Sequence, residues 1–308
     1  MDDREVMVSV SMPVYNHEKY ISQAIEGVLM QQTNFKFELI IGEDCSNDGS
    51  RRIIQDYEKR YPDIIKAIYH PVNIGVKNNA ISIYRRAKGK YWAICEGDDY
   101  WTDKHKLQKQ VDFLENHAQY SAVYHNVICV DKRDRPCKRT SINKYPHKAE
   151  QTYTLEMLRG MALAGQSASL VCRNLYKILG SRERIKVYEN CDCNGDQRAC
   201  KVLACVGQIF FMEDEMACHR VVLNEGSSYS ASIYKQNTSL HFFSQYIELY
   251  NLIQKLFQKD TSSSDFEKAM RRTSLEYLRR EPNTNNIIIF LKILILSSLN
   301  QIKRITMH

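Results

Sequence analysis

The chain has 308 residues, 44% hydrophobic and 26% charged, which is the composition of a globular protein with one large domain or two small ones. Its 12 glycines and 6 prolines exclude collagen-like and Pro-rich disordered chains. The formal charge is +7, and residues 231–308, with 11 Lys/Arg and 6 Asp/Glu, account for +5 of it. A nucleic-acid-binding core would carry a dense basic stripe, so the nearly neutral first 230 residues argue against a nucleic-acid partner.

Ten cysteines invite a disulfide or zinc interpretation. The acidic start of the chain has no secretory signal, so we expect a cytoplasmic protein with free thiols. The spacing of Cys191, Cys193, Cys200, Cys205 and Cys218 lacks the paired C-x-x-C pattern of zinc sites, and buried thiols are the favoured alternative. No run reaches about eighteen consecutive apolar residues, so no membrane-spanning helix is expected.

The first hundred residues alternate strand-like and helix-like segments. Strands are predicted at 6–14, 37–41, 64–69 and 91–95, and helices at 18–29, from Ser50 onward, and at 78–87. Ser50 is expected to cap the second helix. The strand at 91–95 has no charged residue, as expected of a strand buried on both faces. This alternation predicts an α/β fold with a mainly parallel, Rossmann-like sheet flanked by helices.

Beyond residue 101 the pattern loosens. We expect a helix at 104–114, a strand at 120–130, a polar basic loop at 131–150, and a short helix capped by Thr154. Strands are predicted at 168–172 and 209–223, with a helix at 196–206 between them. From about Leu240 onward only helices are predicted. The chain is therefore expected to divide near residue 230, with a helical C-terminal extension at 231–308.

Polar side chains follow three of the predicted strands, at 13–16, 42–50 and 96–101. In an open parallel sheet, ligands bind at the carboxyl ends of the strands. Three carboxylates within four residues, Glu96, Asp98 and Asp99, repel one another and predict a cation, with Mg²⁺ or Mn²⁺ bridging a diphosphate as the natural choice. For the segment at 42–50 the alternative is equally weighted: Asp44 and Asp48 make turns and a helix cap.

These segments resemble glycosyltransferase family 2. The motifs Pro13-Val14-Tyr15-Asn16, Glu43 to Ser50, Asn73-Ile74-Gly75 with Asn79, and Gly97 to Trp101 stand in that family's order and spacing over about residues 6–226. The match is to the bacterial branch that builds surface polysaccharides such as capsule, O-antigen or exopolysaccharide. The resemblance implies a GT-A fold over 1–230, with a nucleotide-sugar half at about 1–101 and an acceptor half at about 102–230. It also implies inverting transfer of a sugar from a nucleotide diphosphate to a hydroxyl.

The resemblance also implies roles for residues of the nucleotide-sugar half. Asp44 resembles the aspartate that reads the nucleobase, in a pocket shaped by Pro13 and Tyr15, and a UDP-sugar is the favoured donor. Asp98, with Asp99 beside it, resembles the metal-binding element. The chain departs from the family at Glu96 and Glu43, where Asp is usual. The remaining donor-binding candidates are Asn79, Glu96 and Trp101, whose ring either stacks on the sugar or packs in the core.

Inverting transfer needs a base that takes the proton of the attacking hydroxyl. Gly195-Asp196-Gln197 resembles the family's element for this role, and Asp196 at a helix start would have its anion stabilised by the helix dipole. Asp192 and the run Glu213-Asp214-Glu215 are the other candidates for the base. Arg220 is expected either to neutralise the diphosphate or to lie on the surface.

Two further questions stay open in the sequence. Because Glu96 replaces Asp, the chain could instead be a non-catalytic nucleotide-sugar-binding module of transferase-like fold. The apolar run at 287–302, with Lys292, Lys303 and Arg304 around it, predicts either an interfacial helix or a packed one. The first would hold the enzyme at the cytoplasmic face of the inner membrane, near a saccharide or lipid-linked saccharide acceptor. The second would pack on the catalytic domain or on a second subunit.

Overall fold

The computed structural model describes residues 5–137, 148–222, 238–261 and 263–280, and then 282–284, 286–288, 290–295 and 298. Part of the predicted loop at 131–150, the end of the strand predicted at 209–223, and Lys303 and Arg304 lie outside the described residues. The predicted division near residue 230 lies there too, and it stays a prediction. In the described parts, no helix combines the length and the apolar character needed to cross a membrane.

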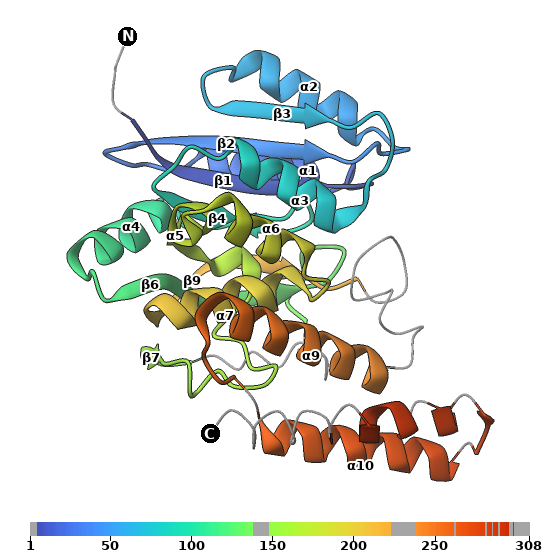
Figure 1. Cartoon of the computed structure of the whole chain (residues 1–308). Coiled ribbons are helices and arrows are strands. Elements are labelled where there is room, and N and C mark those ends of the chain that lie inside the picture. Colours follow the sequence, from blue (N-terminus) through green and yellow to red (C-terminus); the bar gives the residue numbers. More distant parts are fainter. Residues whose placement is uncertain are drawn as a thin grey trace.

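The first half of the fold follows the predicted alternation of strands and helices (Figure 1). The strands β1, β2, β3 and β4 lie in the order β3-β2-β1-β4, and all their pairings are parallel. Because Pro13 pairs with Gly42 and Val14 with Glu43, the polar segments after β1 and β2 begin side by side at one edge. The elements are β1 Val6–Val14, α1 Ile21–Leu29, β2 Lys36–Glu43, α2 Ser50–Arg60, β3 Ile65–Tyr69, α3 Gly75–Arg86 and β4 Tyr91–Ile94.

The sheet continues as a mixed one in the second half. The order runs on as β8-β6-β9-β5 with β7 beside β9, and β8 is antiparallel to both β4 and β6. The prediction of parallel strands therefore holds for the first half, and the sheet as a whole is mixed. The elements are β5 Tyr100–Trp101, α4 Lys106–Asn116, β6 Tyr120–Val130, β7 Gln151–Tyr153, a 3₁₀ turn Ser167–Ser169, β8 Val171–Arg173, α5 Leu175–Leu179, α6 Arg182–Asn190, α7 Gly195–Val206 and β9 Gln208–Arg220.

Three local predictions differ from the structure. Thr154 caps only a turn, with its Oγ1 3.4 Å from the amide nitrogen of Met157, and no helix follows. Ser50 begins α2 rather than capping it, and its hydroxyl accepts a hydrogen bond from the backbone of His17. The unpredicted helices α5 and α6 are capped by Asn174 and Ser181, with Gly180 at φ 74° between them. Their short lengths hide any apolar periodicity, and the caps were the only sequence signal.

Helices cover both faces of the sheet. On one face Tyr57 of α2 donates to Glu26 of α1 at 2.6 Å, and the Leu107 amide of α4 donates at 3.0 Å to Gln31, which lies just after α1. On the other face lie α3, α5, α6 and α7, with α9 Thr238–Phe257 packed beyond them (Figure 1). Each face has its own apolar cluster, one built around Val10 and Ile25 and the other around Trp92 and Val202. Both clusters contain residues from the first and the second half of the sheet, so the two halves pack together.

The described residues of the C-terminal extension are mainly helical, as predicted. Leu249 and Ile253 of α9 enter the apolar cluster built around Trp92 and Val202, and α10 Ser264–Arg280 follows. Ile293 of the last segment is fully buried against Phe243 and Tyr246, so this segment packs on the protein with at least one of its sides.

Cysteine thiols and surface charge complete the picture. All ten cysteines are free and eight of them are buried, so the thiols pack in the core as predicted.

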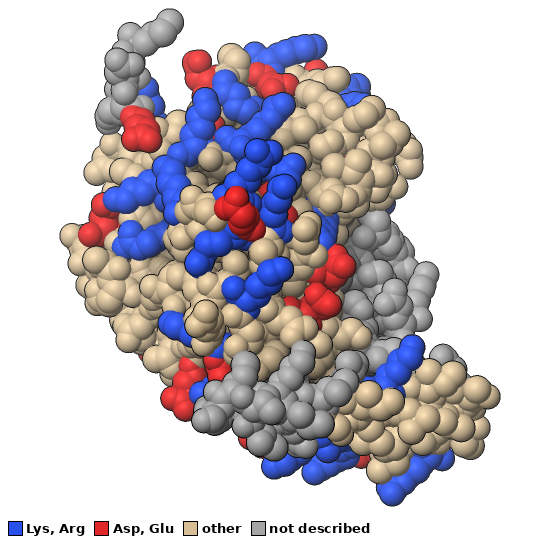
Figure 2. All heavy atoms as spheres, viewed as in Figure 1, with Lys and Arg blue, Asp and Glu red and all other residues tan. Residues whose placement is uncertain are grey.

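Lys and Arg gather over the middle of the face shown in Figure 2, where Figure 1 places α3, α5 and α6. The first 230 residues are thus nearly neutral only in sum.

Candidate active site

The loop after β2 is held by its own carboxylates. Asp44 is 2% exposed, and its two oxygens accept hydrogen bonds from the amides of Ile74 at 2.7 Å and Gly75 at 3.0 Å. Asp48 accepts from the amides of Glu18 and Ser50, each at 3.0 Å. These contacts form the turns and caps that the sequence allowed, and Asp44 ties the end of β2 to the start of α3. Its predicted role at the nucleobase stays a prediction.

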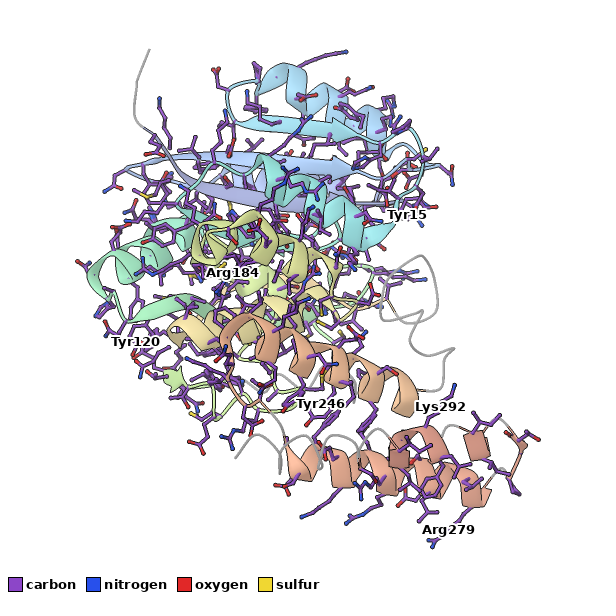
Figure 3. The ribbon with its side chains drawn as sticks, in the orientation of Figure 1. Tyr15, Tyr120, Arg184, Tyr246, Arg279 and Lys292 are labelled. Carbon is purple, nitrogen blue, oxygen red and sulfur yellow. The ribbon has the colours of Figure 1, made fainter. Side chains whose placement is uncertain are left out.

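Glu43 explains one departure from the family pattern. Its carboxylate is fully buried, accepts from the Ser46 amide at 2.6 Å and pairs with Arg51. The longer side chain closes the loop from inside. Pro13 and Tyr15 lie at the neighbouring end of β1, and Figure 3 shows Tyr15 at the carboxyl edge of the parallel strands.

Asn79 was expected to bind the donor, but the structure places it inside the protein. Its amide nitrogen donates to the carbonyl of Gly42 at 2.8 Å, and a Cβ on Gly42 would stand only 2.1 Å from its Oδ1. Asn79 therefore fastens α3 to β2 and depends on the missing side chain of Gly42.

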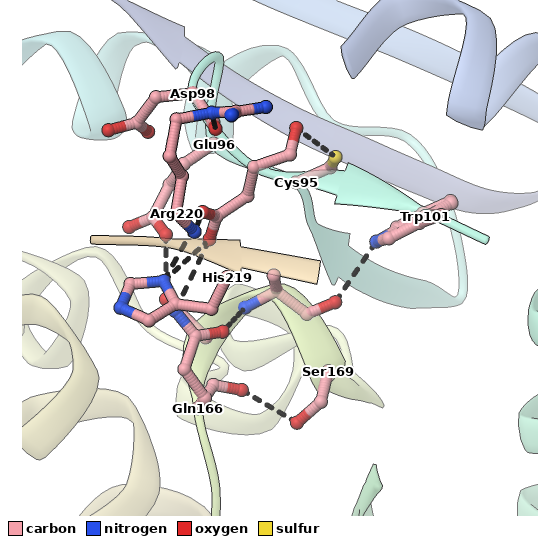
Figure 4. Close-up of polar contacts among 11 residues, drawn as sticks. Cys95, Glu96, Asp98, Trp101, Gln166, Ser169, His219 and Arg220 are labelled. Atoms are coloured by element: carbon pink, nitrogen blue, oxygen red, sulfur yellow. Dashed lines mark hydrogen bonds and ion pairs between the residues drawn. The ribbon is translucent and has the colours of Figure 1, made fainter. Parts of the chain in front are cut away.

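The carboxylates after β4 fall into two kinds (Figure 4). Asp99 is 2% exposed and fully engaged: it accepts from the Arg220 amide at 2.8 Å, lies 3.1 Å from His219 Nδ1 and accepts from Gln166 at 3.3 Å. Asp98 is half-buried, and among the described residues its carboxylate has no hydrogen-bond or ion-pair partner. Asp99 is thus fixed to β9, whereas Asp98 is open to a ligand.

Glu96 lies between these groups. Its Oε2 accepts a hydrogen bond from the Ser167 hydroxyl at 2.8 Å. Burial raises the pKa of Glu96 well above its usual range, and the carboxylates of Asp99, Asp196 and Asp98 raise it further. The acid groups from the end of β4 and from α7 therefore share one electrostatic neighbourhood.

Asp196 reaches this neighbourhood from the start of α7, as predicted from the sequence. Asn194 caps the helix, with its side-chain oxygen 3.4 Å from the Asp196 amide nitrogen. Burial raises the pKa of Asp196 to about 6; the charge of His219 opposes the shift and that of Asp99 adds to it. No described residue is hydrogen-bonded to the Asp196 carboxylate, so it is free to accept a proton.

The other candidates for the base lie elsewhere. Asp192 is 81% exposed and pairs with Lys77 at 2.5 Å. Asp214 pairs with Lys109 at 2.8 Å, and its neighbours Glu213 and Glu215 are exposed in the middle of β9. None of these four carboxylates is grouped with Glu96 and Asp99, so Asp196 remains the candidate.

His219 and Gln166 belong to the site but were not predicted as site residues. Burial lowers the pKa of His219, but the adjacent Asp99 carboxylate outweighs it and raises the value to about 9, so the imidazole is protonated at neutral pH. Gln166 Nε2 lies 2.8 Å from His219 Nδ1. Their role depends on the antiparallel pairing of β5 with β9, which places Tyr100 opposite Cys218. The sequence held no signal for that pairing.

Trp101 and Arg220 have structural contacts instead of the expected ligand contacts. Trp101 is 2% exposed, donates to the carbonyl of Ala168 at 3.0 Å and packs under Lys106, so it offers no ring face to a sugar. Arg220 is buried, and its guanidinium pairs with Asp134 at 2.8 Å, donates to Gln23 at 2.9 Å and lies over the Tyr20 ring. It is neither on the surface nor free for a diphosphate.

The site can be tested for its fit to a divalent ion. Among the described residues no group of three or more His, Cys, Asp or Glu side chains could hold a metal. Mg²⁺ and related ions are commonly bound by one or two carboxylates, waters and the phosphates of the substrate. The open carboxylate of Asp98 fits such a site, while Asp99, whose oxygens already have partners, positions it.

A GT-A fold is what this architecture defines: a parallel first half continued by a mixed second half, with carboxylates at the strand ends. The sequence model of glycosyl transferase family 2 matches residues 9–179, more than half of the chain. The chain therefore belongs to glycosyl transferase family 2, as its motifs predicted.

Two curated relatives illustrate the sequence similarity. An uncharacterized protein of Mycobacterium tuberculosis is 45% identical over 121 residues, which cover 39% of this chain and 34% of the relative. The putative teichuronic acid biosynthesis glycosyltransferase TuaG of Bacillus subtilis is 34% identical over 151 residues, 49% of this chain and 56% of the relative. The chain thus spans between about a third and just over half of these relatives.

Solved structures confirm the fold. TarS of S. aureus in complex with UDP-GlcNAc superposes with a TM-score of 0.64 at 15% identity, covering 94% of this chain and 80% of TarS. The mannosyltransferase PcManGT of Pyrobaculum calidifontis, in complex with GDP-Man and Mn²⁺, gives a TM-score of 0.52 at 13% identity, with 98% and 88% coverage. At such identities the likeness concerns the fold alone.

Proposed function

We propose that the chain is an inverting glycosyltransferase that moves a sugar from a nucleotide diphosphate-sugar to a hydroxyl acceptor. One observation carries this proposal: Asp98 and Asp196, whose carboxylates have no hydrogen-bond partner among the described residues, come from different elements to the same group of fixed polar residues. Asp98 is suited to the diphosphate of the donor, and Asp196 is suited to take the proton of the acceptor hydroxyl.

In this proposal each residue of the site has a distinct role. The Asp98 carboxylate would hold Mn²⁺ or Mg²⁺ together with the diphosphate, and the ion would stabilise charge on the departing nucleoside diphosphate. The Asp196 carboxylate takes the proton of the attacking hydroxyl as the bond to the anomeric carbon forms. Asp99 and His219 hold the loop that carries Asp98. Asp44, Pro13 and Tyr15 surround the nucleobase, with Asp44 oriented by the start of α3.

The substrate class has support from the relatives. TarS was solved with UDP-GlcNAc, which favours a UDP-sugar donor, and the GDP-Man complex of PcManGT keeps a GDP-sugar as the second candidate. TuaG of Bacillus subtilis, a putative teichuronic acid biosynthesis glycosyltransferase, favours a pathway of surface-polysaccharide biosynthesis. The acceptor would then be a saccharide or a lipid-linked saccharide at the cytoplasmic face of the inner membrane.

Nucleotide release from UDP-, GDP- and dTDP-sugars, measured with Mn²⁺ and with EDTA, tests the proposal. We expect release with one donor class, lost on chelation and reduced at least about 100-fold by Asp98→Asn. Asp214→Asn removes an exposed carboxylate far from the site and should leave release unchanged. Tight donor binding without any release, with or without acceptor mixtures, would instead identify the non-catalytic nucleotide-sugar-binding module.

A further inference from the structure

The basic surface on α3, α5 and α6 is the strongest charge feature outside the site. Residues 85–90 and 173–190 contain nine Lys or Arg and two Asp or Glu, a net charge of +7. Glu189, one of the two acids, is buried and forms two hydrogen bonds with Arg85, at 2.9 and 2.7 Å. We define the basic face by its exposed members: Arg85, Arg86, Lys88, Lys177, Arg182 and Lys186.

Internal contacts make this face a single rigid surface. Lys177 of α5 donates to the carbonyl of Lys88 at 3.3 Å, and Tyr176 of α5 donates to Glu189 of α6 at 2.7 Å. Beneath them the rings of Tyr84 and Trp92 stack at 4.5 Å. Arg86, Lys88, Lys177, Arg182 and Lys186 have no ion pair with any described residue, so their charge is available to a partner.

The last described segment adds an apolar stripe. Ile287, Ile288, Leu291 and Ile295 are between 44% and 58% exposed, although Ile293 of the same segment is fully buried. At 100° per residue the four exposed side chains lie on one side of a helix and Ile293 on the other. Lys292 is exposed at the margin of this stripe. Such a helix, apolar on its outer side and flanked by a cation, is typical of a membrane interface.

Both features lie on the same side of the molecule. Figure 2 shows the basic face over the middle of the view and a largely uncharged surface at the lower right. In Figure 1 the dark red segment that follows α10 crosses in front of α10 at that place. We propose that this side docks on a bilayer of acidic phospholipids, with the basic face on the headgroups and the apolar stripe inserted between them.

Charge and geometry favour a membrane as the occupant. Stable membrane attachment generally needs two signals, and here an electrostatic and an apolar one are present together. A second copy of the chain would bring the same positive charge against the basic face and be repelled. α6, part of the basic face, ends at Asn190, and the candidate base Asp196 follows six residues later at the start of α7. The basic face is therefore joined to the site by a short stretch of chain. A lipid-linked acceptor would then be delivered along the bilayer.

Vesicle co-sedimentation of the full chain tests this docking. The docking proposal rests on the proposed function, but this experiment measures membrane binding alone. A negative result would therefore leave the proposed transfer activity untouched. We expect binding to vesicles of 70% phosphatidylcholine and 30% phosphatidylglycerol, more than about tenfold weaker binding to pure phosphatidylcholine, and release as NaCl rises from 0.1 to 0.5 M.

Two variants and one control locate the contact. The triple variant Arg86→Glu, Lys177→Glu, Arg182→Glu should weaken binding by more than about tenfold, as should Ile288→Gln, Leu291→Gln, Ile295→Gln. The control Arg52→Glu, Lys59→Glu, Lys104→Glu makes the same change of charge on the opposite side of the sheet and should weaken binding far less. Thermal unfolding verifies that each variant is folded.

Other results would overturn the proposal. Absence of binding to acidic vesicles would do so, as would equal loss in the control and in the basic-face variant. A concentration-dependent dimer that the Gln variant converts to a monomer, without vesicle binding, would assign the stripe to a second copy. Retention on an acidic polysaccharide without vesicle binding would assign the basic face to a polymer.

Discussion

The ends of β2 and β4 both carry acidic residues, but they differ in what those residues hold. After β2 the carboxylates of Glu43, Asp44 and Asp48 are all occupied by protein donors. After β4 Asp99 and Glu96 also have protein donors, whereas Asp98 has none among the described residues. A carboxylate with backbone partners stabilises a loop, whereas one without them is available for chemistry. At this edge of the sheet, therefore, the carboxylates after β2 stabilise their loop, whereas Asp98 after β4 is available to a ligand.

Replacing the second open carboxylate should have the largest effect on catalysis. Asp196→Asn keeps the shape of the side chain but removes the proton acceptor, so we expect kcat to fall about 10²- to 10⁴-fold. The free energy of unfolding should change by less than about 0.5 kcal/mol, because no described partner is lost. Steady-state kinetics and urea unfolding measure the two quantities. Normal turnover in this variant would remove Asp196 as the base.

Removing the occupied carboxylate should instead destabilise the fold. Asp99→Ala leaves the His219 side chain and the Arg220 amide without their buried partner, and we expect a loss of about 3–5 kcal/mol in the free energy of unfolding. Because the pKa of His219 is raised to about 9, the part of this stability that comes from the pair is complete below about pH 6.5. It should disappear as pH rises through about 9. Urea unfolding at pH 6 and pH 9.5 tests both statements, and equal losses at the two values would contradict the second.

The loop after β2 should respond more mildly. Asp44→Ala removes two hydrogen bonds to the start of α3, at a cost of about 1–3 kcal/mol in the free energy of unfolding. If Asp44 also contacts the nucleobase, the KM for the donor should rise in Asp44→Ala while kcat changes less. Asp48→Ala, which loses only exposed and half-buried contacts, is the matched comparison. A large fall in kcat with unchanged KM would place Asp44 in the chemical step.

The smallest expected effect is an acidic limb in the pH profile of the activity. Asp196 must be deprotonated to accept a proton, and burial raises its pKa to about 6. Activity should therefore fall about tenfold for each pH unit below about 6 and be flat just above it. The residual activity of Asp196→Asn should lack this limb. An identical limb in the variant would assign the titration to another group.

Local patterns predicted the first half of the fold because each of its strands and helices is specified by nearby residues. Four strands and three helices followed from periodicity. Asp44, Asp98 and Asp196 were proposed from the resemblance to the family, and their roles stay predictions. The errors concern Asn79, Trp101 and Arg220, polar or amphipathic residues that the fold buries. Gly42 receives Asn79, and Arg220 finds Gln23 and Asp134 from distant parts of the chain. Such pairings depend on three-dimensional packing, which short sequence spacing does not encode.

The hydrogen bond between β9 and Asp99 also affects when the loop after β4 can become ordered during synthesis and folding. Asp99 and its partner amide are 121 positions apart in the chain, so the loop that presents Asp98 is fixed only after β9 has been made and docked. The four parallel strands of the first half involve shorter separations and can form earlier. A nascent chain that has passed β4 but not β9 would have a nucleotide-type sheet with an unsecured loop. Under the proposed function, the chain would become competent for catalysis late in folding, when β9 is added to the sheet.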